Sequence, residues 1–253
     1  MIQLPKDHMS VSQVKMYQNC PKQYEFRYID GLVSPPGVAL VEGSSHHATL
    51  EINNKQKVKT HEDLDVKEVV SNFCDAFATK CKEIESWDDS KDAVITRGKG
   101  LLEAYMDEHA PAIQPEAVEM EVHYPLAVGN QDIDVLAYID LIQKGMLSDY
   151  KCVKRTKSQR DADDDLQLAV YSTALDCENV EFICLAKTKV PKVTRVPSVV
   201  TATRKKWAMQ VMRSTIRAIS AGVFPVCSPD NFLCCQRFCG YWRKCRGKNE
   251  CKF

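Results

Sequence analysis

The stretch LSDYKCVKR, residues 147–155, places a carboxylate and an ammonium one residue apart, directly after a short apolar run. Successive side chains of a strand point to opposite faces, so Asp149 and Lys151 would share one face while Tyr150 points into the other layer. Two explanations fit this pair: a solvated ion pair, or part of a metal-dependent site that acts on a phosphodiester. The pattern alone does not decide between them.

A second carboxylate precedes this pair along the chain. Asp140 ends the apolar segment VLAYID, and a turn at Lys144-Gly145 would fold this segment back against the next strand. Two carboxylates on one side of a sheet repel each other, and they are suited to hold a hard divalent cation through oxygen. Such a cation offsets charge on a phosphate and activates a water, which Lys151 would orient.

Two other segments carry polar residues at helical spacing. In EGSSHHATLE, His47 and Glu51 lie one helical turn apart, and in DLQLAVYSTAL so do Gln167 and Tyr171. Taken alone, the first is explained by a stabilising His–Glu pair and the second by the polar edge of an amphipathic helix. Neither pair by itself indicates a functional site.

Composition sets limits on the class of protein. The chain has 253 residues, no net charge, 44% hydrophobic residues and 27% charged residues, which is typical of a globular protein. Zero net charge argues against a purely electrostatic nucleic-acid binder but not against a local basic groove, and basic residues gather in 151–160, 204–206 and 237–248. No segment has the apolar length of a membrane span, and the N-terminus lacks a secretory signal, so we expect a cytoplasmic, intracellular protein.

Cysteine content points to a second site. The chain has twelve cysteines, and six of them lie between Cys227 and Cys251. Without a secretory signal, a disulfide framework is the less favoured explanation. The clustering therefore predicts a metal or cluster site near the C-terminus.

The periodicity of apolar residues predicts an α/β fold. Helices are expected over 11–29 with Ser10 as the N-cap and a break at Pro21, 44–56 after a loop over 31–43, 66–86, 92–109, 161–177 and 204–222. Strands are expected over 117–128, 133–142, 145–151, 180–186 and 193–200, with turns at Gly129-Asn130 and Lys144-Gly145. This order predicts a mixed central sheet flanked by helices. We expect a single domain over 1–253, with a helical N-terminal part (1–112), a core (113–222) and a Cys-rich segment (223–253) that packs back on Cys20.

Taken in order, the polar motifs resemble the PD-(D/E)xK nuclease superfamily, and specifically its RecB-like branch. Proteins of that branch carry four motifs in this order along the chain: G-x-x-x-H-x-x-x-E, G-x-I-D, D-Y-K and Q-x-x-x-Y. The matching residues are Gly43, His47, Glu51, Ala137 to Asp140, Asp149 to Lys151, Gln167 and Tyr171. Ala137 departs from the usual glycine, and the spacing from Gly43 selects His47 rather than His46.

The resemblance implies a restriction-endonuclease-like core and a role for each matched residue. The groups that would bind Mg²⁺ or Mn²⁺ are His47, Asp140, Asp149 and the backbone carbonyl of Tyr150. The residues that would support the site and the DNA backbone are Gln167 and Tyr171. Lys151 would orient the attacking water, and Glu51 would contact the metal ligands rather than the metal itself. Glu119 and Glu121, on the preceding strand, would face either the site or the solvent.

The cysteines also resemble part of this family. Its iron–sulfur members have an N-terminal cysteine that joins three near the C-terminus, and the matching residues are Cys20, Cys235, Cys239 and Cys245, with Cys234 and Cys251 as alternatives. Thiolates are the ligands that a 4Fe–4S cluster requires, and such a cluster would link the two ends of the chain. Structural Zn²⁺ on the same thiolates is the alternative.

The implied activity is that of a metal-dependent DNA exonuclease acting on duplex ends or single strands. These motifs are shared by CRISPR-associated iron–sulfur exonucleases and by related phage and viral enzymes. They do not distinguish among four biological processes: CRISPR adaptation, recombination, repair and phage DNA processing. CRISPR-integrase or recombination proteins are candidate partners, and a virus-encoded protein would act in the host cell. The alternatives are a non-catalytic DNA-binding or structural subunit, or a zinc ribbon alone, which would leave the His47 to Lys151 series unexplained. No P-loop motif is present.

Overall fold

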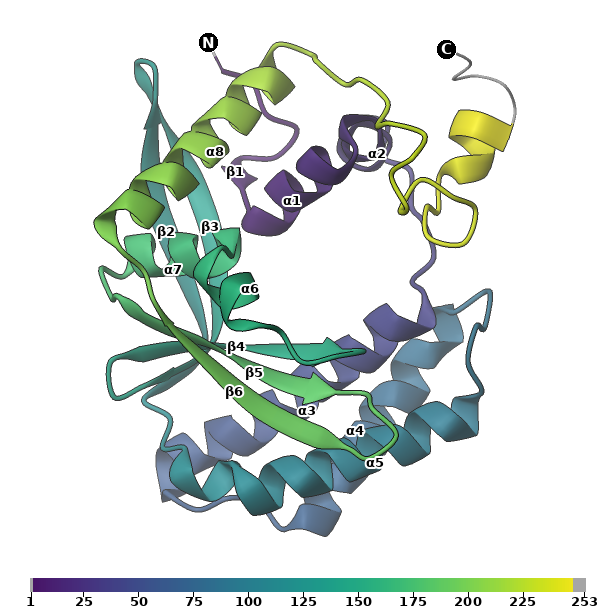
Figure 1. Ribbon diagram of the computed structural model, residues 1–253, viewed down its shortest axis with the longest axis vertical. Helices are drawn as coiled ribbons and strands as arrows, with labels where there is room; N and C mark the ends of the chain where they lie inside the picture. The colour runs from purple at the N-terminus through teal and green to yellow at the C-terminus, as the bar shows by residue number, and fades with distance from the viewer. Residues whose placement is uncertain (1, 248–253) are drawn as a thin grey trace. The chain divides into compact units, whose positions relative to one another are not determined.

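The computed structural model describes residues 2–247, and the chain divides into two compact units (Figure 1). Unit 1 comprises Met1–Pro35, His123–Ala137 and Lys206–Phe253. Unit 2 comprises Pro36–Val122 and Tyr138–Lys205. These units do not follow the three consecutive parts expected from the sequence, and a single domain over 1–253 stays a prediction. Strands β2 and β3 each run from one unit into the other.

A mixed sheet forms the centre of unit 2. Its strands are the end of β3 (Gln131–Gln143), β4 (Met146–Val153), β5 (Asn179–Ala186) and β6 (Lys192–Val199). Strands β3 and β4 are antiparallel, β4 and β5 are parallel, and β5 and β6 are antiparallel. The predicted mixed central sheet is confirmed.

Tight turns set the register of the strands that lead to β4. Lys144 and Gly145 both have positive φ, 45° and 68°, which is the conformation of a two-residue hairpin turn, and Leu141 pairs with Ser148 across it. Gly129, with φ of 66°, turns β2 (Ala117–Val128) into β3. Both turns lie where the sequence predicts them.

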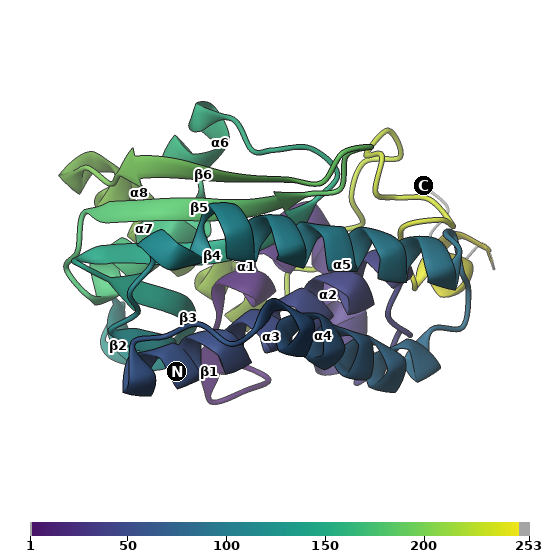
Figure 2. The same ribbon diagram turned by 90° about the horizontal axis from the view of Figure 1, so that it is seen from below.

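Helices cover both faces of this sheet (Figures 1 and 2). Those on one face are α3 (Val38–Thr60), α4 (Val66–Lys80) and α5 (Lys91–Glu108), followed by the short turns Cys81–Glu83 and Ala110–Ala112. Those on the other face are α6 (Gln159–Asp163) and α7 (Leu166–Ala174). The core between α3–α5 and the sheet includes Phe73, Phe77, Leu101, Tyr105 and Leu185, all fully buried. This helix–sheet–helix layering confirms the predicted fold class.

Helix α3 is longer than its sequence predicts. It begins at Val38, directly after Gly37, whereas a loop was expected to continue to residue 43. Gly43, the last residue of the expected loop, lies inside the helix, and a Cβ atom there would sit 3.8 Å from the Cβ of Cys152 on β4. Gly43 therefore marks a close approach of α3 to the sheet rather than a break in the helix.

The helix predicted over 161–177 is divided into α6 and α7. Asp165 separates them because its side chain accepts hydrogen bonds from the backbone N–H groups of Gln167 and Leu168, at 2.7 and 3.1 Å. A carboxylate at this position satisfies N–H groups that have no partner inside the new helix. The Asp165 cap therefore sets the residue at which α7 begins, and so the direction in which the Gln167 side chain leaves the helix.

Unit 1 joins the two ends of the described chain. Its N-terminal elements are β1 (His8–Met9), α1 (Val11–Asn19), α2 (Pro21–Tyr24) and the π-helix Glu25–Ile29, and its C-terminal elements are most of α8 (Ala202–Ser220) and the π-helix Arg243–Gly247. Ser10 caps α1 as predicted. The Tyr17 hydroxyl donates to Val223 O at 2.5 Å, and the rings of Tyr24 and Phe224 stack at 6.2 Å. None of the helices described in either unit has the length and apolar character needed to cross a membrane.

Candidate active site

The hairpin of β3 and β4 brings two buried carboxylates together in unit 2. Asp140 and Asp149 are 9% and 1% exposed, and the backbone N–H of Tyr150 donates to Asp140 Oδ2 at 2.7 Å. The ring of Tyr150 points into the opposite layer, where its hydroxyl contacts Asn54 at 2.9 Å and Tyr105 at 2.8 Å. Strand alternation therefore leaves the Tyr150 side chain in the core and directs both carboxylates to one face.

Lys151 lies on the same face as Asp149, as its spacing predicts. Its Nζ is 2.6 Å from Asp149 Oδ2 and donates to Gln167 Oε1 at 3.1 Å. The Gln167 amide donates in turn to Asp149 Oδ1 at 2.8 Å. One amide group thus holds both members of the Asp149–Lys151 pair in fixed positions.

Tyr171 continues this network along α7. Its ring stands one helical turn from Gln167, whose amide donates to the Tyr171 hydroxyl at 2.6 Å. The hydroxyl donates to the backbone carbonyl of Tyr138 on β3 at 2.5 Å. Helix α7 is therefore linked to both strands that carry the carboxylates.

Of the two adjacent histidines on α3, His47 is the one that faces the carboxylates. Its Nδ1 lies 3.4 Å from Asp140 Oδ1. The neighbouring His46 is buried, with its Nδ1 2.8 Å from Glu42 O and its ring 4.6 Å from that of Phe73. Adjacent helix positions point about 100° apart, so only one of the two can reach the sheet edge.

A further carboxylate that the sequence left unassigned also reaches this site. Glu119 on β2 offers an oxygen within 4.8 Å of ligand atoms of both His47 and Asp140. Its φ of 49° interrupts the regular strand geometry at this position. Glu121 instead accepts a hydrogen bond from the Tyr138 hydroxyl, and Glu51 pairs with Lys55.

The site concentrates negative charge in a largely buried part of unit 2. Burial raises the pKa of Asp149 to about 6; the Lys151 ammonium opposes this change and Asp140 adds to it. Burial, with the charge of Asp140, raises the pKa of Glu119 to about 7. Burial lowers the pKa of His47, but its contact with Asp140 outweighs that effect and the net change is upward. A cation held between these groups would stabilise all the carboxylates in their ionised form.

Sequence and structure comparisons place this arrangement in a family. A family model described as the PD-(D/E)XK nuclease superfamily matches residues 8–246. The chain belongs to the PD-(D/E)XK nuclease superfamily. No curated protein sequence matches it.

Two solved structures are similar to this nuclease-superfamily chain. A candidate exonuclease from Eubacterium rectale aligns with a TM-score of 0.57 and 15% identity, over 92% of this chain and 87% of that one. A protein designated SSO0001 aligns with a TM-score of 0.41 and 14% identity, over 79% of this chain and 96% of that one. At this identity the first comparison shows a shared fold.

The residues of the PD-(D/E)XK site fit a hard divalent cation. His47, Glu119 and Asp140 supply two carboxylate oxygens and one imidazole nitrogen around a common point, and Asp149 stands beside Asp140. Oxygen ligands with one imidazole suit Mg²⁺ or Mn²⁺. The sequence motifs indicated His47 and the two aspartates, and the structure shows that Glu119, rather than Glu121, supplies a third carboxylate.

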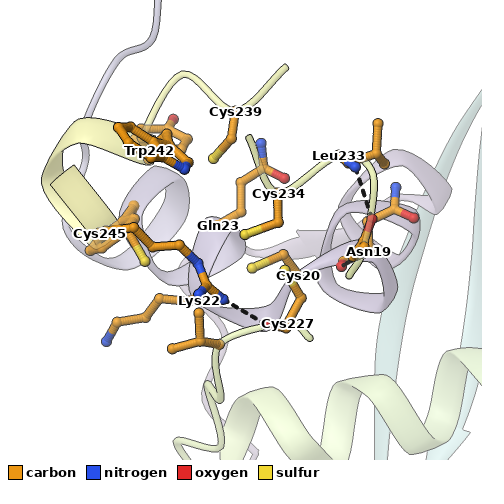
Figure 3. A pocket seen from close by; sticks show the side chains of 15 residues that line it. Asn19, Cys20, Lys22, Gln23, Cys227, Leu233, Cys234, Cys239, Trp242 and Cys245 are labelled. Atoms are coloured by element: carbon orange, nitrogen blue, oxygen red, sulfur yellow. Dashed lines mark hydrogen bonds between the residues drawn. The ribbon is translucent and has the colours of Figure 1, made fainter. Parts of the chain in front are cut away.

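The cysteines gather in a pocket of unit 1, far along the chain from the carboxylates. The cysteines that line it are Cys20, Cys227, Cys234, Cys239 and Cys245, and Figure 3 shows their side chains around the pocket. Burial raises the pKa of Cys227 to about 12, and its contacts with Cys20 and Cys234 add to this. Cys235 is not among the lining residues, and Cys251 lies outside the described residues.

This thiol set fits a metal cluster in its chemistry, since four or more thiols converge from two distant segments. Of the four cysteines matched by the family resemblance, Cys20, Cys239 and Cys245 line the pocket and Cys235 does not. Cys234, the expected alternative, lines the pocket in its place. Adjacent cysteines cannot be distinguished by spacing alone, because the loop conformation decides which sulfur turns inward.

Proposed function

We propose that the protein is a Mg²⁺- or Mn²⁺-dependent deoxyribonuclease that hydrolyses phosphodiesters at DNA ends or in single strands. The observation that supports this is the convergence of His47, Asp140, Asp149 and Lys151 around strands β3 and β4 of unit 2. A non-catalytic member would have lost one of these groups; this chain keeps all four and adds Glu119. The candidate exonuclease with a similar fold supports action at ends.

In this proposal the ligands of the cation are His47, Asp140, Asp149, Glu119 and the backbone carbonyl of Tyr150. When bound, the cation offsets charge on the scissile phosphate and makes a bound water a better nucleophile. The carboxylates hold it because Lys151 and His47 offset only part of their combined negative charge. The hydrogen bond from Tyr150 N–H to Asp140 keeps that carboxylate turned toward the ligand face.

Lys151 acts on the reacting phosphate and water. Burial lowers its pKa, but the adjacent Asp149 charge outweighs burial and the net change is upward, so the side chain is an ammonium at neutral pH. A fixed ammonium orients the attacking water and stabilises the charge that develops on the phosphate oxygens. Gln167 fixes the position of that ammonium, and Tyr171 fixes Gln167 against β3.

The cysteine pocket is proposed to hold a structural 4Fe–4S cluster, with Zn²⁺ as the alternative. The ligands would come from Cys20 in the N-terminal segment and from Cys234, Cys239 and Cys245 in the C-terminal segment, with Cys227 in contact with two of the pocket thiols. The cluster would add a link between two segments that also contact each other directly, for example through Lys22 N–H to Pro225 O at 3.2 Å. Its role in this proposal is to stabilise unit 1.

A digestion of end-labelled single- and double-stranded DNA with Mg²⁺, Mn²⁺ or chelator tests the proposed activity. The wild-type protein is expected to shorten labelled DNA with metal and not with chelator, and Lys151→Ala and Asp149→Ala are expected to abolish this. Lys91→Ala, an exposed lysine at the start of α5, is the control and should be unchanged. Undiminished digestion by both site variants would overturn the proposal, and so would wild-type DNA binding without any cleavage, which would favour a non-catalytic subunit.

A further inference from the structure

An exposed aromatic ring lies beside the carboxylates of unit 2. Tyr138 is 47% exposed and precedes Asp140 by two positions on β3. Residues at this spacing share a face of a strand, about 7 Å apart along it. The odd-numbered neighbours Ala137 and Ile139 are buried on the opposite face. Tyr138 therefore presents its ring on the ligand-bearing face.

Hydrogen bonds hold Tyr138 at its hydroxyl and at its backbone. Its hydroxyl donates to Glu121 Oε2 at 2.8 Å, and its backbone carbonyl accepts from the Tyr171 hydroxyl at 2.5 Å. Through Tyr171 and Gln167 the same network reaches Asp149. An exposed ring that is fixed in this way loses little conformational freedom on binding a ligand.

The charges around the ring select what would contact it. Glu121 accepts the Tyr138 hydrogen bond. Glu119 precedes Glu121 by two positions on β2, and Asp140 follows Tyr138 by two positions on β3. Carboxylates at this distance repel a phosphate that is not neutralised by a cation. The exposed face of the ring therefore suits a flat, uncharged group, and in a nucleic acid that group is a base.

We propose that Tyr138 stacks on the base of the nucleotide adjacent to the scissile phosphate, so that the site takes single-stranded or frayed DNA ends. The inference rests on the proposed nuclease function and deepens it by naming the substrate form. A base within a duplex is already stacked and paired, and it must be unstacked at a cost before a protein ring can contact it. Stacking on an aromatic side chain tolerates any base, so little sequence preference is expected.

Binding measured without cleavage tests the stacking. The Lys151→Ala protein with Mg²⁺ is mixed with short single-stranded oligonucleotides that carry 2-aminopurine at each of the first three positions from either end. We expect quenching of the 2-aminopurine at one end position, and affinity weaker by about tenfold to a hundredfold when Tyr138→Leu is added. Tyr138→Phe keeps the ring and should keep both the quenching and the affinity.

An abasic series separates stacking from a structural role. With an abasic site at the quenched position, the Lys151→Ala protein should bind equally well with and without the added Tyr138→Leu substitution, because no base remains to contact the ring. If Tyr138→Leu instead weakens intact and abasic oligonucleotides equally, or weakens neither, the inference is wrong. Absence of cleavage by the protein with Lys151 intact would overturn the proposed function, and this outcome is distinct because the binding assay does not require cleavage.

Discussion

Gln167 offers a direct test of how the site is positioned, because one amide contacts Asp149, Lys151 and Tyr171 at 2.8, 3.1 and 2.6 Å. Gln167→Met keeps the length of the side chain and removes all three hydrogen bonds. A hydrogen bond to a buried charged group contributes about 1.5–3 kcal/mol. Loss of a group that orients a metal ligand weakens metal binding by about 10- to 100-fold, or about 1.4–2.8 kcal/mol, so the two magnitudes agree.

The assay is calorimetric titration of Mn²⁺ into DNA-free protein at pH 7.5, with thermal unfolding measured in parallel. Gln167→Met should bind Mn²⁺ about 10- to 100-fold more weakly, because Asp149 loses a donor that favours its ionised form and protons then compete with the metal. Thr173→Val is the control on the same helix, since its hydroxyl bonds only to Ala169 O among the contacts described, at 2.7 Å. Mn²⁺ binding by Gln167→Met at the wild-type affinity would refute the reasoning.

Two further predictions concern the cysteine pocket and the buried histidine. Cys234→Ser should lower the iron content and visible absorbance of purified protein, whereas Cys235→Ser should leave both near wild type; the reverse result would exclude Cys234, and a colourless wild type containing zinc would favour the alternative metal. Burial lowers the pKa of His46 to about 4, partly opposed by Glu42, so the unfolded state binds the extra proton first as the pH falls below about 6.5. This residue should therefore lower the free energy of unfolding by about 3 kcal/mol between pH 7 and pH 4. Denaturant unfolding of His46→Phe should show a shallower pH dependence than wild type, and an equally steep dependence would contradict this prediction.

Most of the local structure follows from the sequence alone. Alternation in β3 and β4 and the Lys144-Gly145 turn are enough to place Asp140 beside Asp149, because a two-residue turn fixes the register of a hairpin. The spacing of Gln167 and Tyr171 likewise places them on one face of α7. Such features depend on contacts between residues near one another in the chain, which short-range rules describe well.

Other features depend on how distant segments pack. Helix α3 lies close to β4 at Gly43, opposite Cys152, and no local pattern contains this contact. The irregular φ of Glu119 and the exposure of Tyr138 arise where β2 and β3 meet, and the conformation of the C-terminal loop turns Cys234 rather than Cys235 into the pocket. The amino-acid sequence is sufficient to predict the type and order of most elements, the order of the motifs and the chemistry that they offer. Which of several equivalent side chains reach each site is visible in the folded structure alone, because it depends on the packing of segments that lie far apart in the chain.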